Sequence, residues 1–156
     1  MVPHRVLHVD GFPPPRNPRL AAVWLLMEDH PADERRPPFC AVASHRSALQ
    51  LYGLPGLSGP AHEFTGAPMR LRALDGVWLH PGRLVDGEWR VVDGIPVTSP
   101  ARTVRDFAAC PDVDDGELQA IVSRFVRRGL ACEDELALAA AHGRKETPQW
   151  RRGIRR

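Results

Sequence analysis

The sequence is poor in several residue types, and each shortage argues against a class of protein. Its three cysteines, Cys40, Cys110 and Cys132, are an odd number without short spacing, which argues against a disulfide framework and a zinc knuckle. No apolar run approaches the roughly 18 residues of a membrane span, and the N-terminus lacks the apolar stretch of a signal peptide. We therefore expect a cytoplasmic protein that does not contact a membrane.

The overall composition is that of an ordinary globular domain. The chain has 156 residues, of which 43% are hydrophobic and 26% are charged, so one domain with a real core is expected. The 16 prolines limit long helices. The formal net charge of +2 conceals a basic tail, because residues 143–156 carry six basic side chains and one acidic one. A nucleic-acid footprint, if there is one, would be local to this tail.

The first part of the chain alternates short strands and helices. Residues 5–9 alternate polar and apolar side chains, which is typical of a strand. Asn17 is expected to cap a helix that runs to about His30, and residues 31–38 are expected to form an exposed loop. Residues 39–43 then predict a buried strand, and Ser44 is expected to cap a helix that ends at Gly53.

Residues 62–97 are rich in strand signals. The segments HEF, MRLRAL, GVWLH, EWRVV and IPV are separated by turn residues that include three Asp-Gly pairs. Asp-Gly is a strong hairpin signal. This part of the sequence therefore predicts a small antiparallel meander.

The C-terminal half is predicted to be helical. Ser99 and Pro100 are expected to open a helix that ends near Cys110. A strongly amphipathic helix follows, from about residue 114 to Gly129, and another runs from about residue 133 to His142, with a stop at Gly143 and one more turn possible after residue 148. About five helices packed on a small antiparallel sheet form an α+β fold.

A metal site is not predicted from the spacing of the ligand types. His4 and His8 are the only close pair of histidines, and on a strand they would lie about 13 Å apart. We therefore expect neither a metal ion nor another cofactor.

A catalytic site is not predicted either. Ser44 or Ser99 could be combined with His45 and with Asp93 or Asp106 as a triad, but no nucleophile-elbow motif surrounds either serine. Both serines suit helix caps better, because a capping hydroxyl satisfies a free backbone N–H group. The sequence predicts a protein without enzymatic activity.

The remaining candidates are binding features. The tail joins Trp150 to four arginines that could contact phosphates, although a solvated terminus is the favoured explanation. Three further tryptophans are expected in the core or in one protein interface. The four arginines are Arg151, Arg152, Arg155 and Arg156, and the tryptophans are Trp24, Trp78 and Trp89.

Three segments in this order closely resemble the AbiEi family of abortive-infection antitoxins, which are transcriptional regulators of type IV toxin–antitoxin systems. They are AVASHRSALQLYGLP (residues 41–55), GVWLHPGRL (76–84) and VVDGIPVTSPARTVRDFAA (91–109), followed by a helix that ends in FVRRGL (125–130). The most specific match lies around residues 93–106. The motif positions are Ser44, His45, Arg46, Asp93, Ser99, Pro100, Arg102, Thr103 and Asp106.

The resemblance implies a domain organisation and a partner. Residues 16–142 correspond to the family's C-terminal antitoxin domain, residues 1–15 look like the last strand and linker of a winged helix that normally precedes it, and 143–156 form the basic tail. The implied partner is a nucleotidyltransferase-like toxin, counteracted directly or indirectly. Promoter DNA is implied as a partner only with the winged helix, and some relatives continue into a Vsr-like nuclease.

The motif residues also have physical roles that need no catalysis. Arg102 and Asp106 stand four residues apart and are expected to pair, weakly if exposed and with larger effect if buried. Thr103 is expected to bond a backbone carbonyl or a neighbouring strand. Two other functions remain open: a DNA-binding regulator that uses the basic tail, and a metal-dependent hydrolase or nuclease built on Asp93, Asp106 and His45.

Overall fold

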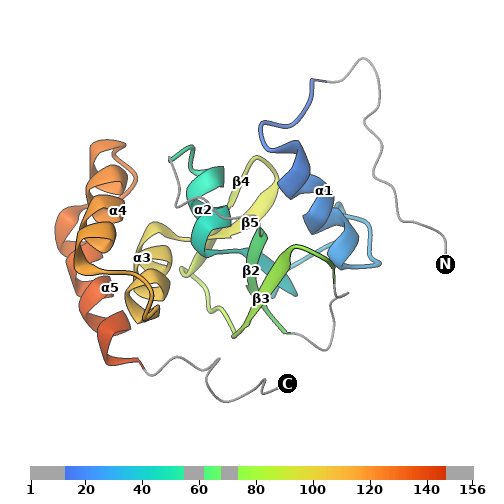
Figure 1. Cartoon of the computed structure of the whole chain (residues 1–156). Helices are drawn as coiled ribbons and strands as arrows, with labels where there is room; N and C mark the ends of the chain where they lie inside the picture. The colour runs from blue at the N-terminus through green and yellow to red at the C-terminus, as the bar shows by residue number, and fades with distance from the viewer. Residues whose placement is uncertain (1–12, 55–61, 68–73, 147–156) are drawn as a thin grey trace.

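The computed structural model describes residues 13–54, 62–67 and 74–146, and these form an α+β fold with five helices and a five-stranded sheet (Figure 1). Helices α3, α4 and α5 gather at one side of the sheet, and α1 lies at the opposite side (Figure 1). The elements are α1 (Pro18–Met27), β1 (Ala41–Ala43), α2 (His45–Leu51), β2 (His62–Gly66), β3 (Val77–Pro81), β4 (Trp89–Val92), β5 (Ile95–Thr98), α3 (Pro100–Ala109), α4 (Asp115–Arg127) and α5 (Glu133–Lys145).

The sheet is mixed, so the predicted antiparallel meander is wrong. Its strand order is β3-β2-β1-β5-β4. The pairs β1–β2 and β4–β5 are antiparallel, whereas β1–β5 and β2–β3 are parallel. Strand β1 is buried at all three positions, which suits a central strand covered on both faces. Of the three Asp-Gly pairs, Asp93-Gly94 joins adjacent antiparallel strands, and its φ angles of 49° and 79° suit a tight hairpin turn.

Helix α5 continues through Gly143, where the sequence predicted its end. The helix runs to Lys145, and Gly143 is buried against α3. A Cβ atom added at Gly143 would overlap the backbone carbonyl oxygen of Arg105 and crowd the side chain of Ala108, which would lie 2.8 Å away. The glycine therefore permits close packing of two helices rather than a change of backbone direction.

The loop after α1, predicted to be exposed, contains a buried residue. Arg35 is buried, and its guanidinium donates hydrogen bonds to the carbonyl oxygens of Trp24 (2.9 Å), Leu25 (2.9 Å) and Glu28 (3.2 Å). These are carbonyls near the C-terminal end of α1 that lack helical partners. Arg35 therefore caps α1 from outside the helix.

Of the three predicted helix caps, Ser99 is confirmed and Asn17 and Ser44 are wrong, whereas Asp114 is a cap that the sequence did not predict. The side chains of Ser99 and Asp114 accept hydrogen bonds from the backbone N–H groups of Arg102 (3.4 Å) and Glu117 (2.8 Å). The side chains of Asn17 and Ser44 make no capping bond within the described part of the chain. At α2 a carboxylate from another strand takes over this role, as described below.

The three tryptophans occupy different environments. Trp24 is buried and donates a hydrogen bond from its indole N–H to the carbonyl oxygen of Ala41 at 3.3 Å. Trp89 is half-buried and packs edge-on against Phe39. Trp78 is 62% exposed on β3, so it does not belong to the core.

Several predictions lie outside the described residues, among them the strand at 5–9 with His4 and His8, the MRLRAL strand except for its last residue, and the turn after residue 148. Among the described residues, no helix is long and apolar enough to cross a membrane.

Candidate functional site

Two of the motif segments meet at one edge of the sheet. Strands β1 and β5 are parallel neighbours, with Ala43 paired to Val97. The carboxyl ends of both strands therefore lie at the same edge, where α/β sheets commonly bind ligands. The residues that follow them, Ser44 after β1 and Ser99 after β5, lead into α2 and α3 at this edge.

The neighbouring strands bring two glutamates to the same edge. Because β2 runs antiparallel to β1, and β4 antiparallel to β5, each begins where its neighbour ends. The backbone N–H of Ser44 donates to the carbonyl of Glu63 at 2.9 Å, and that of Ser99 donates to the carbonyl of Glu88 at 2.9 Å. Glu63 and Glu88 thus stand beside the motif residues, although neither was singled out from the sequence.

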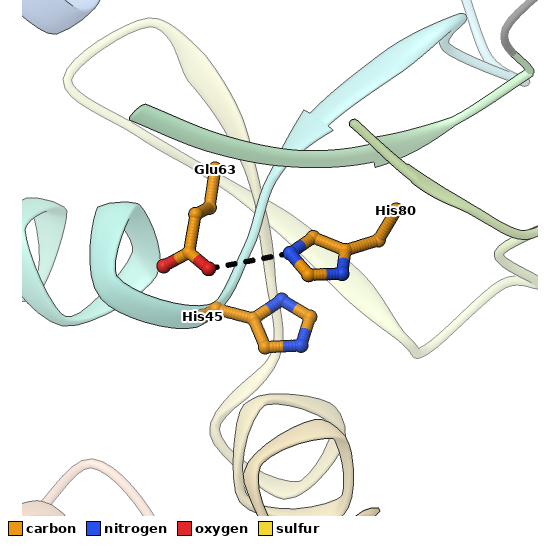
Figure 2. A group of neighbouring side chains, drawn as sticks. All are labelled: His45, Glu63 and His80. Carbon is orange, nitrogen blue, oxygen red and sulfur yellow. Dashed lines mark hydrogen bonds and ion pairs between the residues drawn. The ribbon is translucent and has the colours of Figure 1, made fainter. Parts of the chain in front are cut away.

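His45, Glu63 and His80 form a compact cluster at this edge (Figure 2). The ring of His45, at the start of α2, stacks on the ring of His80 with centroids 3.8 Å apart. Nε2 of His80 lies 3.3 Å from Oε1 of Glu63. One nitrogen from each histidine and one oxygen of Glu63 all lie within 4.8 Å of one another.

The backbone around His45 is unusual. Its φ angle is 48°, in the left-handed region that few residues other than glycine adopt. The next residue, Arg46, donates its backbone N–H to Oε2 of Glu63 at 3.0 Å, so Glu63 caps α2 in place of Ser44. Ser44 Oγ lies instead 3.1 Å from Nδ1 of His45. Strained residues of this kind are concentrated at functional sites.

Burial and nearby charges determine the ionisation of the cluster. Burial, followed by the proximity of His80, lowers the pKa of His45 to about 3, so its imidazole is neutral at pH 7. Burial alone would raise the pKa of Glu63, but the hydrogen bond from His80 and the nearby His45 and Arg46 lower it overall. The guanidinium of Arg46 lies 3.3 Å from the Glu63 carboxylate. The cluster therefore combines a carboxylate with a neutral imidazole.

A network of ion pairs lies beside the cluster. Arg102 Nε donates to Oδ1 of Asp106 at 2.7 Å, and Arg102 also donates to Glu88 at 2.8 Å. Arg105 donates to the other oxygen of Glu88 at 3.0 Å and also binds Glu146. The side chains of Arg102 and Asp106 are only 14% and 10% exposed, so the predicted pair exists and is largely buried.

A cavity of about 650 Å³ is lined both by the two histidines of the cluster and by the residues of the ion-pair network. Two buried polar atoms near it have no hydrogen-bond partner among the described residues, Oγ1 of Thr65 and Oδ2 of Asp106. Such atoms are unusual in protein interiors. The lining residues include His45, Thr65, His80, Arg83, Val85, Glu88, Arg102, Arg105, Asp106, Cys110 and Glu146.

The structure gathers most of the predicted motif positions but not all. His45, Arg102 and Asp106 line the cavity, and Thr103 bonds the β5 backbone as expected, its hydroxyl lying 3.2 Å from the carbonyl of Thr98. Asp93 is exposed in the β4–β5 turn and is not among the described lining residues. The segments 44–46 and 99–106 therefore belong to this region, whereas Asp93 has the role of a turn residue. Arg151, Arg152, Arg155 and Arg156 lie outside the described residues.

Sequence spacing did not find Glu63 and His80. Spacing identifies metal ligands that are close in sequence, such as His4 and His8, whereas Glu63 and His80 are 17 residues apart and meet through the parallel β2–β3 pairing. A weak signal was present, because Glu63 is a charged residue in a strand that is otherwise buried from that position on. Histidine nitrogens and a carboxylate oxygen are ligands that bind divalent transition metals.

Comparisons of the chain with protein-family models, with curated proteins and with solved structures found no match.

Proposed function

We propose that this chain is an antitoxin domain of the AbiEi type, a non-enzymatic cytoplasmic protein that counteracts a nucleotidyltransferase-like toxin. The observation that carries the proposal is the meeting of the resembling segments. Residues 41–55 and 91–109 are far apart in the sequence, yet β1 and β5 pair in parallel and direct both segments to one cavity. Both segments supply polar side chains to this cavity, His45 from the first and Arg102 and Asp106 from the second, as expected if the two segments serve one function.

The rim of the cavity has the chemistry of a protein-binding surface. Arg83 and Val85 are exposed and line the cavity. Trp78 is 62% exposed on the edge strand β3, two residues before His80. Tryptophan and arginine are enriched among the residues that dominate binding at protein interfaces. We place the toxin contact at this rim, which we define as the exposed residues Arg83 and Val85 at the cavity together with Trp78 on the neighbouring strand β3.

Growth rescue tests the proposal. The toxin encoded beside this chain is induced in a bacterial host with and without the chain, and colony formation is counted. Restored growth with the chain present is the expected result. Failure to restore growth, with the chain in the soluble fraction and the toxin shown to be active, contradicts the antitoxin function.

Hydrolysis of nucleic acid at the same cavity is the second candidate function, because His45 and Asp106 both line it. Asp93 has no part in this version, since it lies in the β4–β5 turn. Cleavage of labelled DNA and RNA by the purified chain, lost in a His45→Asn variant, would favour hydrolysis. Labelled substrates left intact with Mg²⁺, Mn²⁺ and Zn²⁺ would argue against it.

A further inference from the structure

The cluster of His45, Glu63 and His80 has the composition and approach of a three-ligand metal site. The three donor atoms come from the start of α2, from β2 and from β3, and they lie within 4.8 Å of one another (Figure 2). Donors bound to one tetrahedral zinc ion at about 2.0–2.2 Å lie about 3.4 Å apart. Because the rings of His45 and His80 are stacked, binding one ion requires these rings to rotate until a nitrogen of each points to it.

The sheet register explains why these side chains face one another. Alternate residues of a strand point to opposite faces, so Glu63 and Thr65 share one face of β2. His80 is the direct β3 partner of Thr65, which places it on that same face. Helix α2 begins at this face, because its first residues bond Glu63 through the backbone N–H of Arg46. The register of β2 and β3 therefore brings both sheet ligands to His45.

A neighbouring backbone group orients the carboxylate ligand of the cluster. Oε2 of Glu63 accepts the Arg46 backbone N–H at 3.0 Å, and Oε1, on the side of His80, also accepts from the Arg46 guanidinium at 3.3 Å. A hydrogen bond to the second oxygen of a carboxylate ligand holds that ligand in position and affects metal affinity. Nδ1 of His45 faces Glu63 and His80 in Figure 2 and lies 3.1 Å from Ser44 Oγ, a contact that a metal ion bound at this nitrogen would replace.

The surroundings provide room for a ligand that the protein itself does not supply. His45 and His80 line the cavity of about 650 Å³, as does Thr65, which is 2% exposed and whose hydroxyl has no partner among the described residues. A water molecule or an anionic group on a metal ion would give such a hydroxyl a partner. Three protein ligands with a fourth position open to a cavity are typical of catalytic rather than structural zinc sites.

We propose that His45, Glu63 and His80 bind one divalent transition-metal ion of the zinc class, with an open coordination position facing the cavity. The proposal does not depend on the antitoxin function, because its readout is metal binding. The competing explanation is a metal-free network in which Glu63 serves only Arg46 and His80. That network predicts no saturable binding of metal at these residues.

Metal titration of the purified full chain decides between the two. The chain is treated with EDTA, dialysed, and titrated with ZnCl₂ by calorimetry and with CoCl₂ by visible absorption. One equivalent of each metal is expected to bind. The Co²⁺ complex is expected to show d–d absorption without the thiolate charge-transfer band that a cysteine ligand would give. Absence of saturable binding would overturn the proposal.

Two ligand variants and two control variants assign the site. His80→Ala changes a partly exposed edge-strand residue, and His45→Asn keeps a residue that tolerates the φ of 48°. Each is expected to weaken binding by about 100-fold or more while circular dichroism and the melting profile report a folded chain. His62→Ala, on the opposite face of β2, and His142→Ala, exposed on α5, are expected to bind as the unaltered chain does. Full-affinity binding by both ligand variants would overturn the assignment.

Discussion

The Arg102–Asp106 pair offers the sharpest test of the energetics at the cavity. The Asp106 side chain is 10% exposed, and its Oδ2 has no hydrogen-bond partner among the described residues. Arg102→Met would also remove the donor that lies 2.7 Å from Oδ1. Removing one partner of a fully buried pair costs about 3–5 kcal/mol. Because Glu88 keeps Arg105 at 3.0 Å, we expect a loss near the lower end, about 3 kcal/mol at pH 7.

The loss is expected to depend on pH in a defined direction. Burial raises the pKa of Asp106, while the charge and hydrogen bond of Arg102 oppose that rise. Without Arg102, the pKa of Asp106 in the folded chain rises further above its unfolded value. A carboxyl group whose pKa is higher in the folded chain than in the unfolded chain lowers the free energy of unfolding as the pH rises from the unfolded pKa through the folded pKa. The deficit of Arg102→Met is therefore largest at neutral pH and shrinks towards pH 4.

Urea unfolding at pH 7 and pH 4.5 measures this effect. Arg127→Met, on the exposed surface of α4, is the matched control and is expected to change the free energy of unfolding by less than about 0.5 kcal/mol. The double variant Arg102→Met with Asp106→Leu is expected to be more stable than Arg102→Met alone, because it removes the uncompensated charge. A deficit below about 1 kcal/mol at pH 7, or one that does not shrink at pH 4.5, would refute the reasoning.

Three further predictions use the same unfolding assay. Gly143→Ala is expected to destabilise the chain by about 2 kcal/mol or more through its overlap with the backbone of α3. At Gly116, exposed in α4, the added Cβ would meet the exposed Asp114 side chain at 3.2 Å, so Gly116→Ala is expected to have a much smaller effect; equal effects would contradict the packing described for α5. Because the folded pKa of His45 is about 3, below its unfolded value of 6.5, stability is expected to fall as the pH drops from 6.5 towards 3, and His45→Asn should show a shallower slope by up to about 1.4 kcal/mol per pH unit. An unchanged slope would show that His45 is not buried in the neutral form. Thr103→Val is expected to lower the free energy of unfolding by about 1–2 kcal/mol, because it removes the hydroxyl that lies 2.8 Å from the buried hydroxyl of Thr98 on β5. An unchanged free energy of unfolding would count against that bond.

The helices were predictable because their signals are local. Asp114 caps α4, and the apolar spacing from Leu118 to Phe125 supplies its buried face, so both its start and its type follow from adjacent residues. Gly143 misled because a glycine permits either a helix end or a close contact, and only the packing of α5 on α3 distinguishes them.

The sheet and half of the site depend on contacts between distant segments. An Asp-Gly pair specifies a turn between neighbouring segments. The pairing of β1 with the distant strand β5 depends instead on burying Ala41–Ala43 in the middle of the sheet. His45 and His80 each stand in a motif segment, residues 41–55 and 76–84, whereas Glu63 stands in neither, and the three form a group only once β2 and β3 lie side by side. The Glu63 cap of α2 likewise crosses 17 residues, so no local pattern could reveal it.

Growth rescue by two charge-reversal variants tests the central claim, that the chain counteracts the toxin through the rim of the cavity. Arg83→Glu reverses a charge at an exposed residue that lines the cavity, and Arg127→Glu reverses one on the exposed surface of α4. With both variants soluble and equally expressed beside the active toxin, we expect Arg83→Glu to lose rescue and Arg127→Glu to retain it. Equal rescue by both would contradict the assignment of this rim as the antitoxin surface.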